Sequence, residues 1–452
     1  MRPIKFRPLS LIGLCSVFAY LGSQVASATT LQDIYDLAVN NDPEIQAAYA
    51  EYRAGDTLRG QARGVLLPQL NASYTFTDTN KTLLESEEEK EEYGVTLSQS
   101  ILNLPAVYSY AQSKAVAKQS QLTFHVAEQD LIVRVAEAYF NVLRGRDNLA
   151  SARAEEKAIA QQLEQTQQRY EVGLIAITDV HEAQAAYDLA IANRLTEEVN
   201  LGISREALAA ITGQAHHNLQ ELAMEFPISA PEPNNEESWV EFATANNLSI
   251  QLAEQVLEAA NQNARIANSE AAPTVQASAR YIKDEPFQFA SSSGVSKAEG
   301  MIMQLSVDLP IFSGGSRHAE RKQAGFERVA EQSNLVATKR RVLQETRSNF
   351  LTTVADTARV QARKRAITSA QSALDATEAG YEAGTRNIVD LLNAQRDLYR
   401  AQRDYANTRY DYVVNSLKLK RAAGTINAKD LETINGWLRA GQAATIAAQS
   451  HS

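Results

Sequence analysis

One long unit is written twice in this chain. Residues 38–46, AVNNDPEIQ, resemble residues 243–251, ATANNLSIQ, at an offset of 205. Residues 170–179 recur at 381–390, sharing the pattern Tyr-Glu-x-Gly-x-x-x-Ile-x-Asp at an offset of 211. Two long copies indicate a duplicated fold, because a solenoid would show many short repeats. The chain is therefore expected to fold into two similar halves, joined by a proline-containing linker at 226–237.

Each half predicts the same order of elements: helix, strand, loop, strand and a very long helical region. Apolar side chains take every second position in four segments: Leu70 to Phe76, Tyr93 to Ile101, Val275 to Tyr281 and Met301 to Ile311. Gln99 alone interrupts an apolar side. About ten alternating residues with aromatics near the ends are typical of strands that cross an outer membrane. A soluble sheet packed on one face has the same period, so periodicity leaves both open.

Polar segments separate the strands within each pair. Residues 85–92 hold six glutamates and one lysine, and residues 290–299 are rich in serine and glycine. Both are expected to be loops outside a membrane.

The remaining sequence predicts unusually long helices. No proline occurs in 106–170 or in 316–381, and such stretches reach about 100 Å at 1.5 Å per residue if they are continuous. Apolar and small residues there recur at spacings of three and four, which is typical of coiled coils. Gly173 and Gly384 are expected to end these helices, and a second helix then returns in each half. Each half thus predicts a helical hairpin.

The first 28 residues predict a secretory signal, with three basic residues, a short apolar stretch and the cleavage site Ala26-Ser27-Ala28. Its removal takes away three positive charges and the only cysteine, Cys15, so the net charge falls from −10 to −13. Nucleic-acid binding needs the opposite balance and is not expected. Beyond residue 28 no run of eighteen apolar residues predicts a transmembrane helix, which leaves a periplasmic protein or a β-barrel.

Four strands alone have unpaired edges, and lipid cannot satisfy their backbone groups. Whole copies of the chain would supply eight strands from two chains or twelve from three. Eight strands enclose little more than their own side chains, so an open channel needs three or more chains. If these strands cross a membrane, assembly is compulsory.

The duplicated layout and its motifs resemble the TolC family of outer-membrane efflux and type I secretion channels. The resemblance rests on residues 172–180, VGLIAITDV, and 383–392, AGTRNIVDLL, together with 138–143, AYFNVL, and 369–376, SAQSALDA. It extends from about Leu31 to about Ile434. It implies a mostly helical homotrimer, in which four strands per chain form a 12-stranded β-barrel in outer-membrane lipid that is continued by an α-helical barrel in the periplasm. It also implies two partners, a periplasmic adaptor (membrane fusion) protein and an inner-membrane resistance-nodulation-division or ABC transporter.

The resemblance implies roles for six residues. In the family the periplasmic end is closed by coiled helix ends and opens when they untwist. The links that hold it closed would involve Thr178, Asp179, Tyr381 and Arg386. Arg386 also lies four residues before Asp390, so it can instead pair along its own helix.

The narrowest point of the family's entrance is lined by an aspartate that matches Asp390. Three converging copies would attract cations and repel anions. The family has a second aspartate three positions on, where this chain has Asn393. This departure halves the expected ring charge.

No enzymatic activity or cofactor is expected. The chain lacks the HExxH, GxSxG, GxGxxG and P-loop patterns. Gly314-Gly315 is expected to be a strand-to-helix turn, and His216-His217 to be a loop pair without the further ligands that a metal site requires. Two alternatives are a soluble coiled-coil scaffold or adaptor, which would not need the alternating strands, and a diffusion porin, which would not need so much helix.

The predicted organisation divides the chain into nine segments. These are the signal (1–28), first-repeat helix (29–67), first hairpin (68–102), long helices (103–213), linker (214–237), second-repeat helix (238–272), second hairpin (273–312), long helices (313–424) and tail (425–452).

Overall fold

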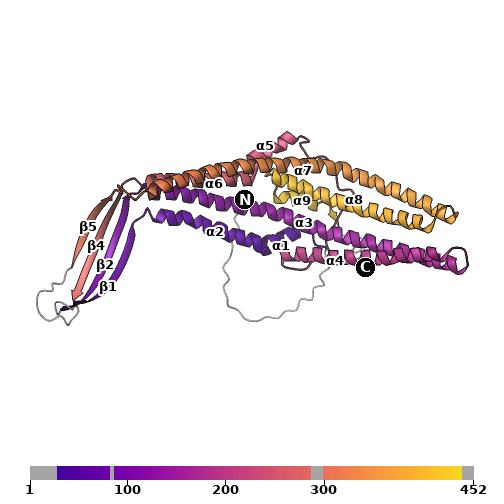
Figure 1. The fold of residues 1–452 in the computed structure, drawn as a ribbon, viewed down its shortest axis with the longest axis horizontal. Coiled ribbons are helices and arrows are strands. Elements are labelled where there is room, and N and C mark those ends of the chain that lie inside the picture. Colours follow the sequence, from indigo (N-terminus) through magenta and orange to yellow (C-terminus); the bar gives the residue numbers. More distant parts are fainter. Residues whose placement is uncertain (1–27, 82–85, 287–298, 440–452) are drawn as a thin grey trace.

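A computed structural model describes residues 28–81, 86–286 and 299–439 of the 452-residue chain. The molecule is elongated, with a β-sheet at one end and the tips of two helical hairpins at the other (Figure 1). Among the described residues, no helix has both the length and the apolar character needed to span a membrane.

The two halves repeat one order of elements. The first half contains α1 (Leu31–Asn41), α2 (Pro43–Gly64), β1 (Gln69–Lys81), β2 (Ser86–Leu102), α3 (Leu104–Glu171) and α4 (Ile177–Thr212). The second contains α5 (Glu236–Asn246), α6 (Leu248–Ser269), β4 (Thr274–Pro286), β5 (Glu299–Asp308), α7 (Ser316–Glu382) and α8 (Ile388–Ala422). Short elements lie outside this repeat: β3 (Glu221–Leu222), α9 (Ala428–Asn435) and β6 (Leu438–Arg439).

The four long strands form one antiparallel sheet in the order β1-β2-β4-β5. The two halves meet where β2 pairs with β4, and the register shifts between Ser100 and Leu102. Gln99 faces the apolar side, as predicted, and its amide donates to the carbonyl of Leu66 at 3.0 Å. The exception in the alternation therefore satisfies a backbone group at the end of the sheet.

The long helices are continuous, as predicted, with 68 residues in α3 and 67 in α7. They end before Gly173 and Gly384, whose φ values of 76° and 74° favour glycine. Gly314 and Gly315 also have positive φ, and Gly315 caps α7, as the predicted strand-to-helix turn requires.

A similar corner joins the helices in each half. Asp42 caps α2 before Pro43, and Asn247 caps α6. The Asn41 amide donates to the Thr212 carbonyl at 3.0 Å in the first half. In the second half the Asn247 amide donates to the Ala422 carbonyl at 2.8 Å. Each corner thus holds the C-terminal end of its own hairpin.

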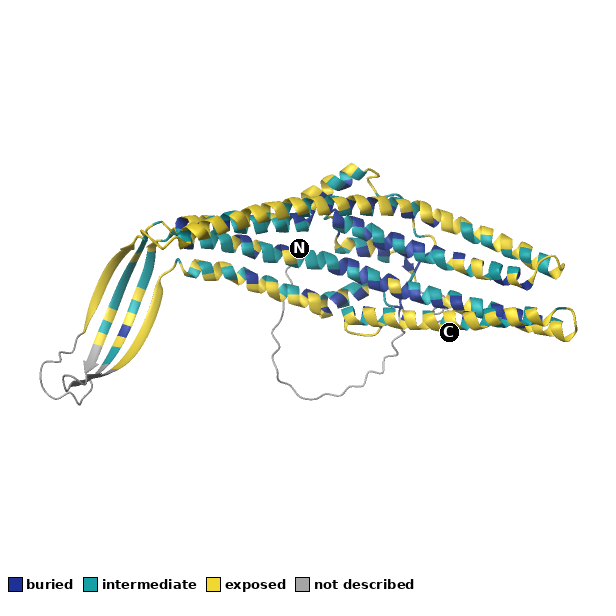
Figure 2. Ribbon diagram, in the orientation of Figure 1, coloured by how far each residue is buried: buried dark blue, intermediate teal, exposed yellow. Residues whose placement is uncertain are grey.

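The main core lies midway along the molecule, where α3 and α8 are most buried (Figure 2). Tyr139 and Phe140 are fully buried there, and the Tyr139 hydroxyl donates to the Gln220 carbonyl at 2.8 Å. Burial raises the pKa of Tyr139. This contact anchors the segment that precedes β3 to the long helix α3.

Ion pairs align α8 against α3 beside this core. Asp130, Glu137 and Arg144 recur every seven residues along α3. Their partners on α8 are Arg421 at 2.8 Å, Lys418 at 2.6 Å and Asp411 at 2.5 Å. Because these side chains are partly exposed, each pair contributes only about 0–1 kcal/mol. Their regular order fixes the alignment of the two helices more than it adds stability.

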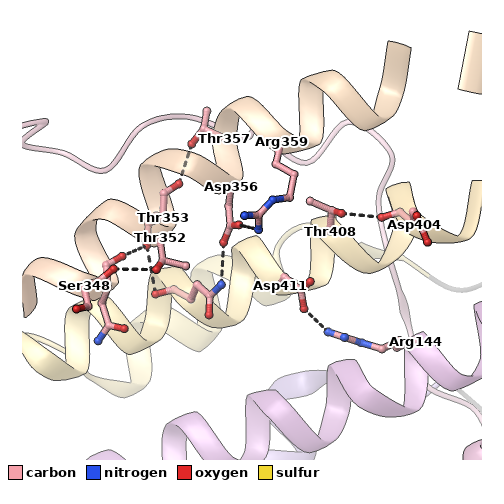
Figure 3. A network of polar contacts seen from close by, with 12 residues as sticks. Arg144, Ser348, Thr352, Thr353, Asp356, Thr357, Arg359, Asp404, Thr408 and Asp411 are labelled. Atoms are coloured by element: carbon pink, nitrogen blue, oxygen red, sulfur yellow. Dashed lines mark hydrogen bonds and ion pairs between the residues drawn. The ribbon is translucent and has the colours of Figure 1, made fainter. Parts of the chain in front are cut away.

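A second polar network joins α7 to α8 (Figure 3). The Asp356 carboxylate is fully buried, and it accepts from Asn415 at 2.7 Å and from Arg359 at 2.6 Å. Arg144 approaches Asp411 on the far side of α8 in the same view (Figure 3). Helix α8 is therefore held by polar contacts on two sides.

Two local expectations about the strands differ from the structure. Residues 86–92 belong to β2 and not to a loop, because their backbone pairs in register with β1 and the sheet extends further than its apolar part. Glu85 and residues 290–298 lie outside the described residues. Strand β5 ends at Asp308 and not at Ile311, since Pro310 has no N–H to donate.

The predicted linker and tail are also partly folded. Strand β3 lies within 214–237 and pairs with β6 within 425–452, while α9 packs on the main core. Two-residue strands are too short to produce a periodic sequence signal. The predicted signal lies outside the described residues except for Ala28.

Candidate functional site

The sheet has two chemically different faces. The strand register brings the predicted apolar side chains of all four strands to one face, and most of them are exposed. Members of this face include Leu70, Tyr74, Leu97, Tyr281, Met303 and Leu305. The other face carries mainly polar side chains, such as Asn71, Ser73, Thr96, Ser278, Arg280 and Gln304. An exposed apolar face that extends over four strands is suited to contact lipid or another protein.

A charge pair lies on the polar face. Arg280 forms an ion pair with Glu92 across β4 and β2. The guanidinium passes Gly94, and a Cβ at that position would come 3.7 Å from it and 2.7 Å from the Ser73 hydroxyl. The separation from the guanidinium is an ordinary van der Waals distance, so the close approach that glycine at 94 avoids is the one to the Ser73 hydroxyl.

The sheet has two open edges in the described chain. Strands β1 and β5 each pair on one side only. The exposed N–H and C=O groups along such edges need another partner where water is absent.

The other candidate region lies at the hairpin tips. An apolar cluster joins the two hairpins just behind these tips, formed by Ile159, Leu163, Ala183, Ala190, Ile388, Leu391 and Leu392. Tyr381 and Leu374 of α7 pack against it. The tips are thus held together within one chain by apolar packing.

The predicted link residues lie in this region but make mostly local contacts. Arg386 pairs with Asp390 at 3.8 Å, four residues along the chain. The Thr178 hydroxyl approaches the Asp179 carboxylate at 3.5 Å. The Tyr381 hydroxyl is buried and has no hydrogen-bond partner within the described chain. Among the described residues, no hydrogen bond joins Thr178 or Asp179 to Tyr381 or Arg386.

The two predicted constriction residues lie in the first turns of α8. Asn387 caps this helix by accepting from the Asp390 backbone at 2.8 Å. The Asp390 side chain is about 40% exposed. The side-chain oxygen Oδ1 of Asn393 accepts from the Arg396 guanidinium at 2.7 Å, so this side chain already has a cationic partner on its own helix.

A contact that the sequence analysis missed lies beside these residues. The Arg169 guanidinium lies over the ring of Tyr381, 4.9 Å from its centroid. Both residues line a polar groove of about 430 Å³ between the ends of α3 and α7, together with Gln162, Gln165, Gln168 and Glu378. The repeated pattern gave no signal for this contact, because position 380, which matches Arg169 in the second half, is glycine.

The histidine pair lies away from both regions. His216 is buried, and its Nε2 is 2.9 Å from the Thr212 hydroxyl. Burial, followed by the neighbouring His217, lowers the pKa of His216. Within residues 28–81, 86–286 and 299–439, no three His, Cys, Asp or Glu side chains are arranged to hold a metal.

Comparison with known proteins finds one family across both halves. The sequence profile of the outer membrane efflux protein family matches residues 34–214 and 239–425. The outer membrane protein TolC of Vibrio cholerae is 35% identical over 427 residues, covering 94% of this chain and 97% of that protein. The alkaline protease secretion protein AprF of Pseudomonas aeruginosa is 28% identical over 433 residues, covering 93% and 90%.

Solved structures share the fold. The CmeC outer membrane channel of Campylobacter jejuni has a TM-score of 0.76 at 16% identity, covering 96% of this chain and 98% of that one. The match confirms the predicted fold class, a mostly helical chain of two repeated halves with a small β part.

Proposed function

This chain belongs to the outer membrane efflux protein family, and from that premise we propose how its two candidate regions build a channel. The protein is an outer-membrane exit duct for drug efflux and type I secretion, and it reaches from the outer membrane into the periplasm. The sheet end lies in the outer membrane and the hairpin tips lie in the periplasm. The duct transports its cargo without catalysing a reaction.

The amphipathic four-stranded sheet with two open edges carries this proposal. Its apolar face contacts outer-membrane lipid, and its polar face lines the aqueous lumen. Edge β5 of one protomer pairs with edge β1 of the next, which leaves no backbone group unpaired in lipid. Three protomers give twelve strands and an open lumen, whereas two give a barrel that its own side chains fill.

Exposed apolar stripes on the helices support the same ring. Leu195, Val199 and Ile203 of α4 are 50–63% exposed, and Phe326 and Val329 of α7 are 74% and 51% exposed. Helices α4 and α7 lie along opposite long edges of the molecule (Figures 1 and 2). The α4 stripe lies in the hairpin half of the molecule and the α7 pair lies nearer the sheet (Figure 1), so in a head-to-tail ring each is covered by a different part of the neighbouring protomer.

The periplasmic tips carry the gate and dock the partners in this proposal. Thr178 and Asp179 of one hairpin lie across a protomer boundary from Tyr381 and Arg386 of the next, where the unpartnered Tyr381 hydroxyl finds an acceptor. Asp390 lines the entrance. An adaptor protein binds the outside of the tips, and a resistance-nodulation-division or ABC transporter delivers cargo at the entrance.

Mass and conductance test the proposal together. The mature chain, purified in detergent, is expected to have a protein mass of three chains by light scattering and to form ion-conducting pores in planar bilayers. A folded monomer that stays in solution without detergent and forms no pores would contradict the proposal.

A further inference from the structure

We propose that Arg169 is a further residue that holds the periplasmic entrance closed, by stacking on the ring of Tyr381 within the same protomer. The inference rests on the proposed channel function and adds to it a link that uses no hydroxyl group. It joins the first repeat to the second, since Arg169 ends α3 and Tyr381 ends α7.

The geometry favours the aromatic ring as the partner of this cation. The Arg169 carbon Cζ lies 4.9 Å from the ring centroid, within the range of a cation–π contact. The ring itself packs on the apolar cluster of the hairpins, so its orientation is fixed from the opposite side. Over the part of the chain that the structure describes, Arg169 forms no ion pair that would compete for its charge.

We call the Arg169–Tyr381 stack the clasp, because its position suits it to hold the ends of α3 and α7 together. Packing between the hairpins runs mainly through α8 against α3 and α4, so α3 and α7 meet at few places. The Arg169–Tyr381 stack is one of these, in the last turn of both helices. An untwisting motion that separates the ends of α3 and α7 therefore has to break it.

The stack forms only once among the described residues, although the sequence unit occurs twice. Tyr170 matches Tyr381 in the first half, yet this residue is 42% exposed and no cation stacks on its ring in the described chain. Gly380 matches Arg169 in the second half, and a Cβ there would lie 2.8 Å from Cγ of Arg386. Because residue 380 is glycine, the Arg386 side chain can lie against it. Arg169 stacks on the ring of the next residue, Tyr381. Two arginines, one from each half, thus converge on residues 380 and 381.

Conductance of the reconstituted full-length trimer tests the clasp. Arg169→Met keeps a long side chain without charge, Tyr381→Leu removes the ring, and Tyr381→Phe keeps the ring without the hydroxyl. We expect Arg169→Met to raise the mean conductance at least threefold, and to do so by the same factor in a Tyr381→Phe background. In a Tyr381→Leu background it should add less than 1.5-fold, because the partner is already absent.

Tyr170→Leu is the matched control, since it removes the equivalent exposed ring and should conduct like the parent. Unchanged conductance in Arg169→Met would overturn the clasp, as would an equal gain in the Phe and Leu backgrounds at 381. A lower heat-dissociation temperature in Arg169→Met with parental conductance would assign the stack to stability alone, which also overturns it. If the parent itself forms no pores, the proposed function fails first.

Discussion

At the scale of single residues, the charge at the proposed entrance depends on which side chains already have a partner within one chain. Asp390 has Arg386 at 3.8 Å, and Asn393 accepts from Arg396 at 2.7 Å. The first pair is well exposed and contributes about 0.3–0.5 kcal/mol. Arg386 therefore neutralises the proposed ring of Asp390 carboxylates only weakly. A carboxylate introduced at position 393 would form an ion pair with Arg396.

Block by a trivalent cation measures this charge. We expect Asp390→Ala to abolish block of bilayer currents, because it removes the three carboxylates of the proposed ring. The double variant Asn393→Asp with Arg396→Gln should strengthen block about tenfold, or roughly 1.4 kcal/mol, because it adds three negative charges to the trimer and removes the three positive charges that would pair with them. Asn393→Asp alone should do less, because Arg396 remains.

Low ionic strength is required for this titration, since salt screens exposed charges. Arg400→Gln is the control for Arg396→Gln, because Arg400 faces Asp397 one turn further along. Block that is unchanged in Asp390→Ala would remove the whole ring from the entrance. Equal block in the parent and in the double variant would remove residue 393 from it.

The motifs predicted which residues lie at the hairpin tips but not all of the contacts there. Residues 178, 179, 381, 386 and 390 can be located from the repeated pattern, and their helix ends follow from Gly173 and Gly384. The stack of Arg169 on Tyr381 could not be predicted in this way. It depends on how far one hairpin rotates against the other, and sequence spacing within either hairpin does not contain that angle.

At the scale of elements, the two corners offer a comparison within one molecule. Gly213 and Gly424 end α4 and α8 with φ of 77° and 72°. A Cβ at 213 would meet only the Asn41 side chain, at 3.6 Å, whereas a Cβ at 424 would come 2.5 Å from the Asn246 backbone. The second corner is therefore packed more tightly than the first.

Substituting alanine for Gly213 or for Gly424 should show this difference in packing. Gly213→Ala is expected to cost roughly 1–2 kcal/mol from left-handed backbone strain alone. Gly424→Ala carries the same strain and must also displace backbone, so its loss of stability should be clearly larger. Heat-induced loss of the helical circular dichroism signal compares the two variants. Equal shifts of the midpoint would mean that the second corner relaxes without cost.

Element boundaries were predictable where a hard constraint marks them. Absent prolines and left-handed glycines define α3 and α7, whose ends match the predicted ones closely. Charge alone was misleading in β2, where an acidic run suggested a loop although its backbone continues the ladder. The pairing of β3 with β6 joins segments more than 200 residues apart, and two residues per strand leave no pattern.

At the scale of the whole molecule, assembly depends on apolar surface that one chain leaves uncovered. The stripe on α4 exposes Leu195, Val199 and Ile203, and burying such a side chain contributes about 1.5–3 kcal/mol. In the proposed trimer this stripe lies at each of three interfaces, so its burial favours assembly. The proposed pairing of the sheet edges adds directional hydrogen bonds that set the register between protomers.

A single charge on this stripe should separate assembly from folding. Ile203→Asp places a carboxylate where the neighbouring protomer's α7 would cover it, and burying an unpaired charge costs several kcal/mol. We expect this variant to keep its helical circular dichroism but to give monomers in detergent and no pores in bilayers. Asn200→Asp is the control, because it adds the same charge to an exposed position of α4 outside the stripe. It should remain trimeric. Light scattering in detergent decides between the two outcomes, and a stable trimer of Ile203→Asp would show that α4 faces solvent or lumen in the assembled duct.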